Sequence, residues 1–185
     1  YHVLNYDIET GEVTARNTHQ GYADDSAWAR GQAWGLYGFT MVYRETRNET
    51  YLNRAMEIAD FIINHPNVPE DGVPYWDYDA EITKTTPRDA SAAAITASAL
   101  LELMQYVIPS RSNSYRDWAT KILTSLSSDS YLAEAGTNNG FLLKHCVGSK
   151  PHNSEIDVPL NYADYYYLEA LYRYNQLPNR NAGKK

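Results

Sequence analysis

The chain has 185 residues, of which 43% are hydrophobic, so it can form one folded domain with a substantial core and is not a disordered segment. Its formal net charge is −7, and its 16 Lys and Arg residues form no cluster, so no nucleic acid is expected as a partner. No stretch reaches the roughly 18 consecutive apolar residues that a membrane-spanning helix needs, so no membrane partner is expected either.

An N-terminal hairpin and five helices are predicted in chain order. Residues 3–16 alternate around Gly11, which is typical of two strands joined by a tight turn. Small and apolar residues then recur with the helical period in five segments. These segments cover residues 25–45, 49–64, 89–107, 114–127 and 161–176. A proline-containing loop, 66–87, and a mixed stretch with several glycines, 135–159, lie between them.

Acidic residues stand at the starts of two predicted helices. Asp25 or Ser26 is expected to cap the first helix, with Asp24 beside it, because a side-chain oxygen there accepts from the free N–H groups of the first turn. Asp89 or Ser91 is expected to cap the helix that follows. Capping is therefore the predicted role of these acids.

Helices of two kinds alternate along the chain. The first, third and fifth are rich in small and aromatic residues, whereas the second and fourth are amphipathic surface helices. This pattern predicts an all-α fold in which inner and outer helices alternate around a ring, as in an (α/α)6 toroid of six helical hairpins. Three inner and two outer helices make less than a closed ring. Residues 1–177 are thus expected to be part of one larger barrel domain, with 178–185 as a polar tail.

Residues 19–34 gather the groups that a sugar needs. Sugar C–H faces stack on aromatic rings, while hydroxyls and carboxylates need directed donors and acceptors. Arg30 and Trp34 share one helical face. Two interpretations of Arg30 remain open. It binds a carboxylate in two hydrogen bonds beside the wall of Trp34, or it is a structural residue paired with Asp24 or Asp25.

Other kinds of chemistry have little support in the sequence. The histidines lack a metal-binding spacing such as His-Glu-x-x-His, so no metal is expected. Neither a glycine-rich phosphate loop nor a Gly-x-Ser-x-Gly elbow occurs, and Cys146 is expected to be a plain buried thiol. The polar segment 144–153 is either a solvated loop or a contact for a sulfate or a second sugar.

Three stretches at the starts of the predicted inner helices carry a resemblance. They are Arg-Gly-Gln-Ala-Trp at 30–34, Thr-Pro-Arg-Asp-Ala-Ser-Ala-Ala at 86–93 and Asn-Tyr-Ala-Asp-Tyr-Tyr-Tyr-Leu-Glu-Ala-Leu at 161–171. Together they resemble the unsaturated glucuronyl hydrolases, glycoside hydrolase family 88. The resemblance covers residues 1–177 and implies the C-terminal half of a six-hairpin catalytic barrel. The alternatives are an unsaturated rhamnogalacturonyl hydrolase, which shares the fold, and a non-catalytic helical module that binds glycans.

The resemblance also implies a reaction. Such enzymes remove the 4,5-unsaturated uronic acid from the non-reducing end of lyase-generated glycosaminoglycan oligosaccharides, which would be the substrate partner. An Asp protonates C4 of the vinyl ether, water adds at C5, and the resulting hemiketal collapses and releases the next sugar. No metal or organic cofactor is implied.

Site residues follow from the same resemblance. His2, Gln20, Arg30 and Trp34 match the substrate-contacting His, Gln, Arg and Trp of the family, and Lys150 is expected near the next sugar. The catalytic Asp and a second essential Asp of the family lie in the N-terminal half of the barrel. No catalytic residue is therefore expected in this chain, which would need that half in order to act.

Overall fold

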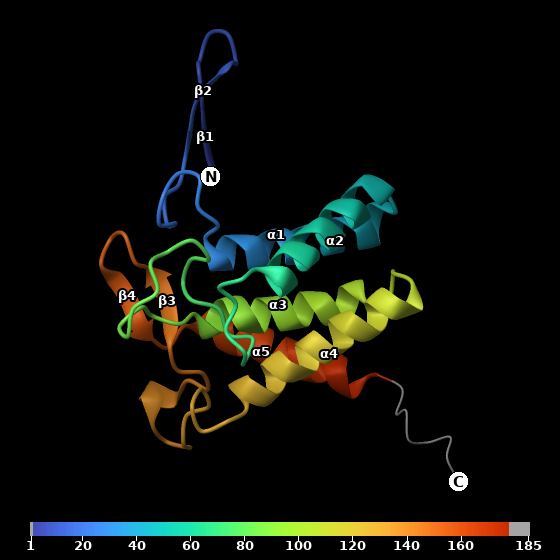
Figure 1. The fold of residues 1–185 in the computed structure, drawn as a ribbon, viewed down its shortest axis with the longest axis vertical. Coiled ribbons are helices and arrows are strands. Elements are labelled where there is room, and N and C mark those ends of the chain that lie inside the picture. Colours follow the sequence, from blue (N-terminus) through green and yellow to red (C-terminus); the bar gives the residue numbers. More distant parts are fainter. Residues whose placement is uncertain (1, 178–185) are drawn as a thin grey trace.

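Residues 2–177 are described by a computed structural model in which helices predominate (Figure 1). The helices are α1 (Ala29–Thr46), α2 (Glu49–Asn64), α3 (Ala90–Leu103), α4 (Pro109–Leu126), α5 (Asn161–Asn175) and the short 3-10 helix η1 (Asn138–Gly140). Two antiparallel hairpins pair β1 (Val3–Tyr6) with β2 (Val13–Asn17) and β3 (Cys146–Ser149) with β4 (Ser154–Val158). The predicted tail, 178–185, lies outside the described residues. Within the described residues, no helix is long and apolar enough to cross a bilayer.

The N-terminal hairpin forms as predicted. Val3 pairs with Asn17 at its base, and the turn contains Gly11 with a φ of +74°, which glycine adopts without strain. Asp7 holds the turn because its Oδ1 accepts from the N–H groups of Glu9 and Thr10 at 2.9 and 2.8 Å. The ribbon projects away from the helices (Figure 1).

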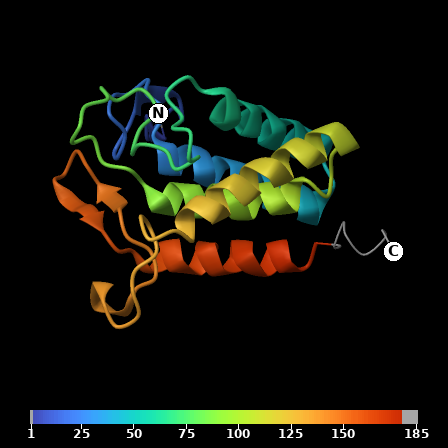
Figure 2. The same cartoon turned by 60° about the horizontal axis from the view of Figure 1, so that its bottom comes forward.

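Helix α3 lies at the centre of the molecule, and all fourteen of its residues are buried. It packs against α1, α4 and α5, and Figure 2 shows α5 running alongside it. Alanines and serines occupy most of its surface, so neighbouring helices can approach from several sides at once. This is the character predicted for an inner helix.

The other helices divide into inner and outer ones as the sequence pattern indicated, but α5 is more exposed than an inner helix was expected to be. The amphipathic helices α2 and α4 pack on α1 and α3 through one apolar face each. In contrast to α3, helix α5 buries Ala163, Tyr167 and Ala170 and exposes Tyr165 and Tyr172 on its other side. That exposed face has no neighbouring helix among the described residues.

Helix α1 begins later than predicted, and its expected caps are wrong. Trp28 occupies the N-cap position without a side-chain hydrogen bond. Asp24 instead accepts from the N–H of Thr18 at 2.8 Å, and Ser26 donates to Asp77 at 2.8 Å. These contacts keep the segment before Trp28 in a folded loop, which capping statistics alone do not reveal.

Two further boundaries differ from the prediction. Helix α3 ends at Leu103, four residues earlier than expected, and α4 begins at Pro109, five residues earlier than expected. Proline suits the first helical position because its missing N–H would have no partner there. The cap of α3 is confirmed, since Asp89 accepts from the N–H groups of Ser91 and Ala92.

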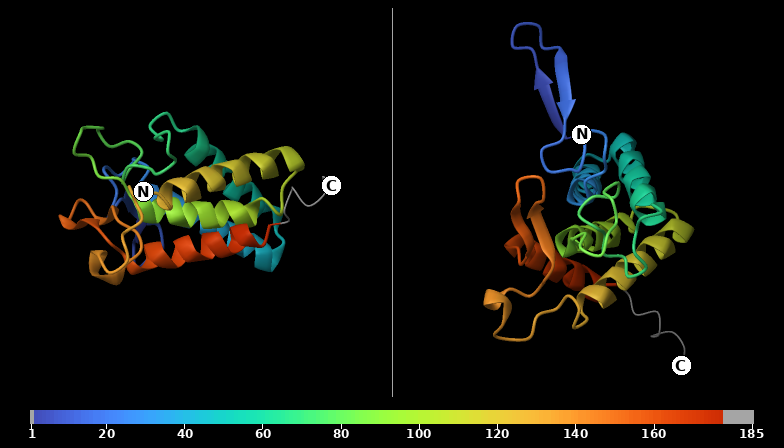
Figure 3. Two further views of the ribbon diagram at one scale, coloured as in Figure 1. Left: turned by 90° about the horizontal axis from the view of Figure 1, so that it is seen from below. Right: turned by 60° about the vertical axis from the view of Figure 1, so that its left-hand side comes forward.

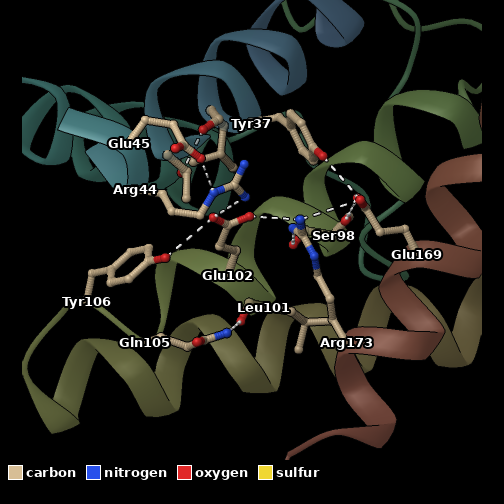
Figure 4. Close-up of polar contacts among 12 residues, drawn as sticks. Tyr37, Arg44, Glu45, Ser98, Leu101, Glu102, Gln105, Tyr106, Glu169 and Arg173 are labelled. Atoms are coloured by element: carbon tan, nitrogen blue, oxygen red, sulfur yellow. Dashed lines mark hydrogen bonds and ion pairs between the residues drawn. The ribbon is translucent and has the colours of Figure 1, made fainter. Parts of the chain in front are cut away.

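Charged side chains join α1, α3 and α5 near the ends of these helices (Figure 4). Glu102 is buried and accepts from Arg44 at 2.9 Å and from Arg173 at 2.8 Å. One turn earlier on α5, Glu169 accepts from Ser98 at 2.5 Å and from the hydroxyl of Tyr37 at 3.2 Å. Because each carboxylate takes donors from two other helices, the cluster fixes the positions of all three.

Candidate sugar-binding site

The starts of α1, α3 and α5 lie at one end of the molecule, together with the β3–β4 hairpin (Figures 2 and 3). Specific contacts hold this end together. The N–H of Ala90 donates to the carbonyl of His145 at 2.9 Å, and Asp164 accepts from the N–H groups of Leu142 and Leu143 at 2.8 and 2.9 Å. The loop before α1 is held in turn by Asp77, which is 1% exposed and accepts from the N–H of Tyr22 at 2.9 Å.

A row of rings and one guanidinium crosses this end. The ring of His2 lies 4.9 Å from that of Trp28, and the guanidinium of Arg30 lies 4.8 Å from the same indole. On its other side Arg30 lies 5.5 Å from the ring of Tyr162, which lies 6.3 Å from the ring of Trp34. Aromatic faces beside a cation suit the C–H faces and the carboxylate of a uronic acid.

Arg30 is 4% exposed, and its partner is Asp89 rather than Asp24 or Asp25. Its Nη1 lies 3.3 Å from Asp89 Oδ2, and its Nη1 and Nη2 donate to the carbonyls of Val147 and Gly148. Of the two interpretations left open by the sequence, the one that pairs Arg30 with Asp24 or Asp25 is therefore wrong, because Arg30 pairs with a different acid. The true partner lies 59 positions away in the sequence, at the start of another helix.

Electrostatics at Arg30 depend on Asp89. Burial raises the pKa of the Asp89 carboxyl, and the Arg30 guanidinium with the Ser91 hydrogen bond opposes that rise. An ion pair at this depth neutralises much of the net charge of the guanidinium. Three of the five N–H donors of Arg30 make the hydrogen bonds described above.

The remaining predicted binding residues lie around the same point. Gln20 donates through Nε2 to the carbonyl of Gly148 at 2.8 Å, which is the carbonyl that Arg30 also contacts. Trp34 is half-buried and meets the ring of Tyr166 edge-on at 5.1 Å. Desolvation lowers the pKa of His2 below its ordinary value of 6.5, so its ring is neutral near pH 7.

Lys150 lies at the tip of the β3–β4 hairpin and lines a pocket of about 250 Å³. Tyr22 and Trp76 form its aromatic side, and their rings meet edge-on at 6.3 Å. Thr83 and Thr86 supply hydroxyls on another side. The pocket is therefore lined by both aromatic rings and hydroxyl groups.

Cys146 is the single cysteine of the chain and lies in strand β3, next to Val147. Cys146 is fully buried, and burial strongly raises the pKa of its thiol, which makes it a poor nucleophile. Among residues 2–177, no group of three or more His, Cys, Asp or Glu side chains is arranged to hold a metal ion.

Sequence reasoning missed several residues of this site. Tyr162 and Asp89 lie within the stretches that carried the resemblance, but neither was assigned to the site. Trp76 lies in the proline-containing loop, where a cluster of aromatic residues at 75–78 was the available signal. Their contribution depends on contacts between segments that are distant in the chain.

The alternation of inner and outer helices defines part of an α/α barrel, and comparisons with known proteins agree. No family model matches the chain. An unsaturated glucuronyl hydrolase of Formosa agariphila is 49% identical over 177 residues, which are 96% of this chain and 44% of that protein. The chain is therefore homologous to unsaturated glucuronyl hydrolases over nearly all of its length, and it spans less than half the length of these relatives.

Solved structures show the same relationship. An unsaturated glucuronyl hydrolase specific for heparin superposes with a TM-score of 0.90 at 56% identity, over 94% of this chain and 46% of that one. The unsaturated glucuronyl hydrolase responsible for the degradation of glycosaminoglycan in Bacillus sp. GL1 gives a TM-score of 0.86 at 35% identity, with the same coverage. The five helices are thus part of an (α/α)6 barrel, as the alternation of inner and outer helices predicted.

Proposed function

We propose that this chain is the C-terminal half of an unsaturated glucuronyl hydrolase and supplies much of its substrate-binding site. The reaction removes the 4,5-unsaturated uronic acid from the non-reducing end of lyase-generated glycosaminoglycan oligosaccharides. The observation that carries the proposal is the row from His2 through Trp28, Arg30 and Tyr162 to Trp34, found in a chain with strong similarity to such enzymes.

Each binding residue then has a role that follows from its chemistry. Trp34 forms the wall against which one face of the unsaturated ring stacks. Arg30, Gln20 and His2 hold the carboxylate and hydroxyls of the uronate through directed hydrogen bonds. Because Asp89 neutralises much of the charge of Arg30, geometry contributes more than net charge there. Lys150 faces the next sugar from its own pocket.

The acid that protonates C4 comes from outside this chain in our proposal. The buried acids among the described residues are Asp77, Asp89 and Glu102, and each one is bound to internal donors. A general acid must instead reach the substrate with its proton. The resemblance to the family implies that the catalytic Asp lies in the other part of the barrel. We therefore infer that this other part supplies the carboxyl group and that neither part turns over substrate alone.

The test compares the protein at its natural length with the 185-residue chain. Both are given unsaturated disaccharides from heparin, from chondroitin and from rhamnogalacturonan, and loss of the absorbance of the unsaturated ring is followed. We expect turnover of glycosaminoglycan disaccharides by the longer protein and none by the chain. Turnover by the chain alone, or a preference for the rhamnogalacturonan product, would contradict the proposal.

Trp34→Ala in the longer protein tests the site itself. Loss of one stacking surface should cost about 1–3 kcal/mol of substrate binding, or roughly a five- to 150-fold rise in KM. Trp118→Ala is the matched control, because Trp118 is half-buried on α4 and contacts Lys121 at 4.3 Å, outside the row of rings. Equal effects of the two substitutions on KM would remove Trp34 from the site.

A further inference from the structure

Asp89 is a fully buried acid at the candidate site to which the binding scheme above gives no direct part. Its Oδ1 accepts from the N–H and the hydroxyl of Ser91 at 3.0 and 2.5 Å. The same oxygen lies 3.4 Å from the N–H groups of Ala92 and Val147. Its second oxygen, Oδ2, lies 3.3 Å from Arg30. One carboxylate thus joins α1, the start of α3 and strand β3.

Arg30 and Asp89 bind the same part of strand β3, Arg30 as a hydrogen-bond donor and Asp89 as an acceptor. Asp89 accepts from the N–H of Val147, and Arg30 donates to the carbonyls of Val147 and Gly148. Gln20 adds a second donor to the carbonyl of Gly148 at 2.8 Å. Lys150 follows two residues later, so these contacts fix the base of the hairpin that carries it.

Helix capping does not account for this arrangement. The cap of α2 shows what capping alone requires, since Asn48 is exposed and accepts through one oxygen from the N–H of Thr50 at 3.0 Å. Asp89 caps α3 in the same way through Oδ1 and has a second oxygen left over. That oxygen meets Arg30, and a carboxylate holds a guanidinium more strongly than a neutral amide does.

We propose that Asp89 is a positioning residue, which fixes Arg30 and the β3–β4 hairpin and thereby sets where Lys150 meets the second sugar. The proposal rests on the proposed function, because it assigns Arg30 and Lys150 to the substrate site. It predicts that Asp89 affects substrate binding through Arg30 and has little effect on the bond-breaking step.

The central variant is Asp89→Asn in the protein at its natural length. Asparagine keeps the shape and the capping oxygen but removes the charge that holds Arg30. Glu102→Gln is the matched control, because Glu102 lies on the same helix, is also buried and is also bound to arginines, but at the other end. KM and kcat are measured for an unsaturated glycosaminoglycan disaccharide, and amide hydrogen exchange is measured over residues 146–158.

The expected result separates the two variants. In Asp89→Asn, KM rises by about tenfold or more while kcat changes less than about threefold, as expected for a lost charge-assisted hydrogen bond in the binding site. Exchange in the hairpin accelerates as well. Glu102→Gln leaves both KM and hairpin exchange close to wild type. Equal KM values in the two variants, or a loss confined to kcat, would overturn the proposal.

A double variant tests whether Asp89 acts through Arg30. Adding Asp89→Asn to Arg30→Met should raise KM by less than about twofold, because the cationic group that Asp89 positions is already gone. Fully additive effects would show an independent role and refute the proposal. If Asp89→Asn does not fold, Ser91→Ala takes its place, since it removes one donor from Oδ1, and faster hairpin exchange is again the expected result.

The experiments distinguish a failure of the proposed activity from a failure of the positioning role of Asp89. A wild-type protein without turnover on any unsaturated disaccharide would refute the activity, whereas hydrogen exchange in the hairpin would still report whether Asp89 holds strand β3. Unchanged exchange in Asp89→Asn would refute the positioning role even in a fully active enzyme.

Discussion

Glu102 offers the sharpest test of what holds the inner helices together. The substitution is Glu102→Gln, which keeps the size of the side chain and removes its charge. The carboxylate is 7% exposed, and both of its oxygens are in use (Figure 4). Oε1 accepts from Arg44 at 2.9 Å, and Oε2 accepts from Arg173 at 2.8 Å.

The expected decrease in the free energy of unfolding depends on which ion pairs Arg44 and Arg173 keep. After the substitution, Arg44 still contacts the exposed Glu45 at 2.8 Å, and Arg173 still contacts Glu169 at 3.5 Å. The amide also places N–H donors against a guanidinium. Removing one member of a buried ion pair typically costs about 3–5 kcal/mol. The surviving contacts and the partial exposure of Arg44 reduce that cost. We therefore expect the free energy of unfolding to fall by about 2–4 kcal/mol.

Urea-induced unfolding measures this loss, with Glu57→Gln as the matched control. Glu57 pairs with Arg54 at 2.7 Å on α2, but the two side chains are 62% and 59% exposed. A surface pair of this kind contributes about 0–1 kcal/mol. If the free energy of unfolding fell equally in the two variants, burial would not determine how much an ion pair stabilises the fold, and the reasoning would be refuted.

Three further outcomes are expected. Burial, aided by the charge of Glu169, raises the pKa of Tyr37 from 10.0 to about 12, so the folded state holds that proton more tightly than the unfolded state does. The resulting stability is complete below pH 10 and is lost as the pH rises from 10 to 12, and Tyr37→Phe should flatten this part of the stability–pH curve measured by urea unfolding. Cys146 should resist thiol reagents in the native protein and react fully only in denaturant, and rapid labelling without denaturant would contradict its burial. Gly148→Ala should displace the β3–β4 hairpin, because the added Cβ would lie 2.6 Å from the Cβ of Glu155. A destabilisation of about 1–3 kcal/mol with faster hairpin exchange is expected, and wild-type behaviour would show that the two strands can separate freely.

The helices were largely predictable because their information is local. The period of apolar residues placed α2 exactly, and the run of alanines and serines in α3 indicated a helix surrounded by neighbours. The cap Asp89 was also predictable, since it depends on N–H groups two and three residues away. The caps assigned to Asp25 and Ser26 failed because Asp77, from a distant loop, engages the segment before α1.

The sequence by itself determined the all-α pattern and the alternation of inner and outer helices, because periodicity needs only neighbours along the chain. The candidate binding residues come from the resemblance to the family and stay a prediction. Only the tertiary structure decided the partner of Arg30. Asp89 lies 59 positions away, and the two meet because α1 and α3 start at the same end of the molecule. The contact also depends on strand β3, whose carbonyls complete the environment of the guanidinium. A buried charge takes its partner from whatever the packing brings within reach, and the packing is a property of the whole fold.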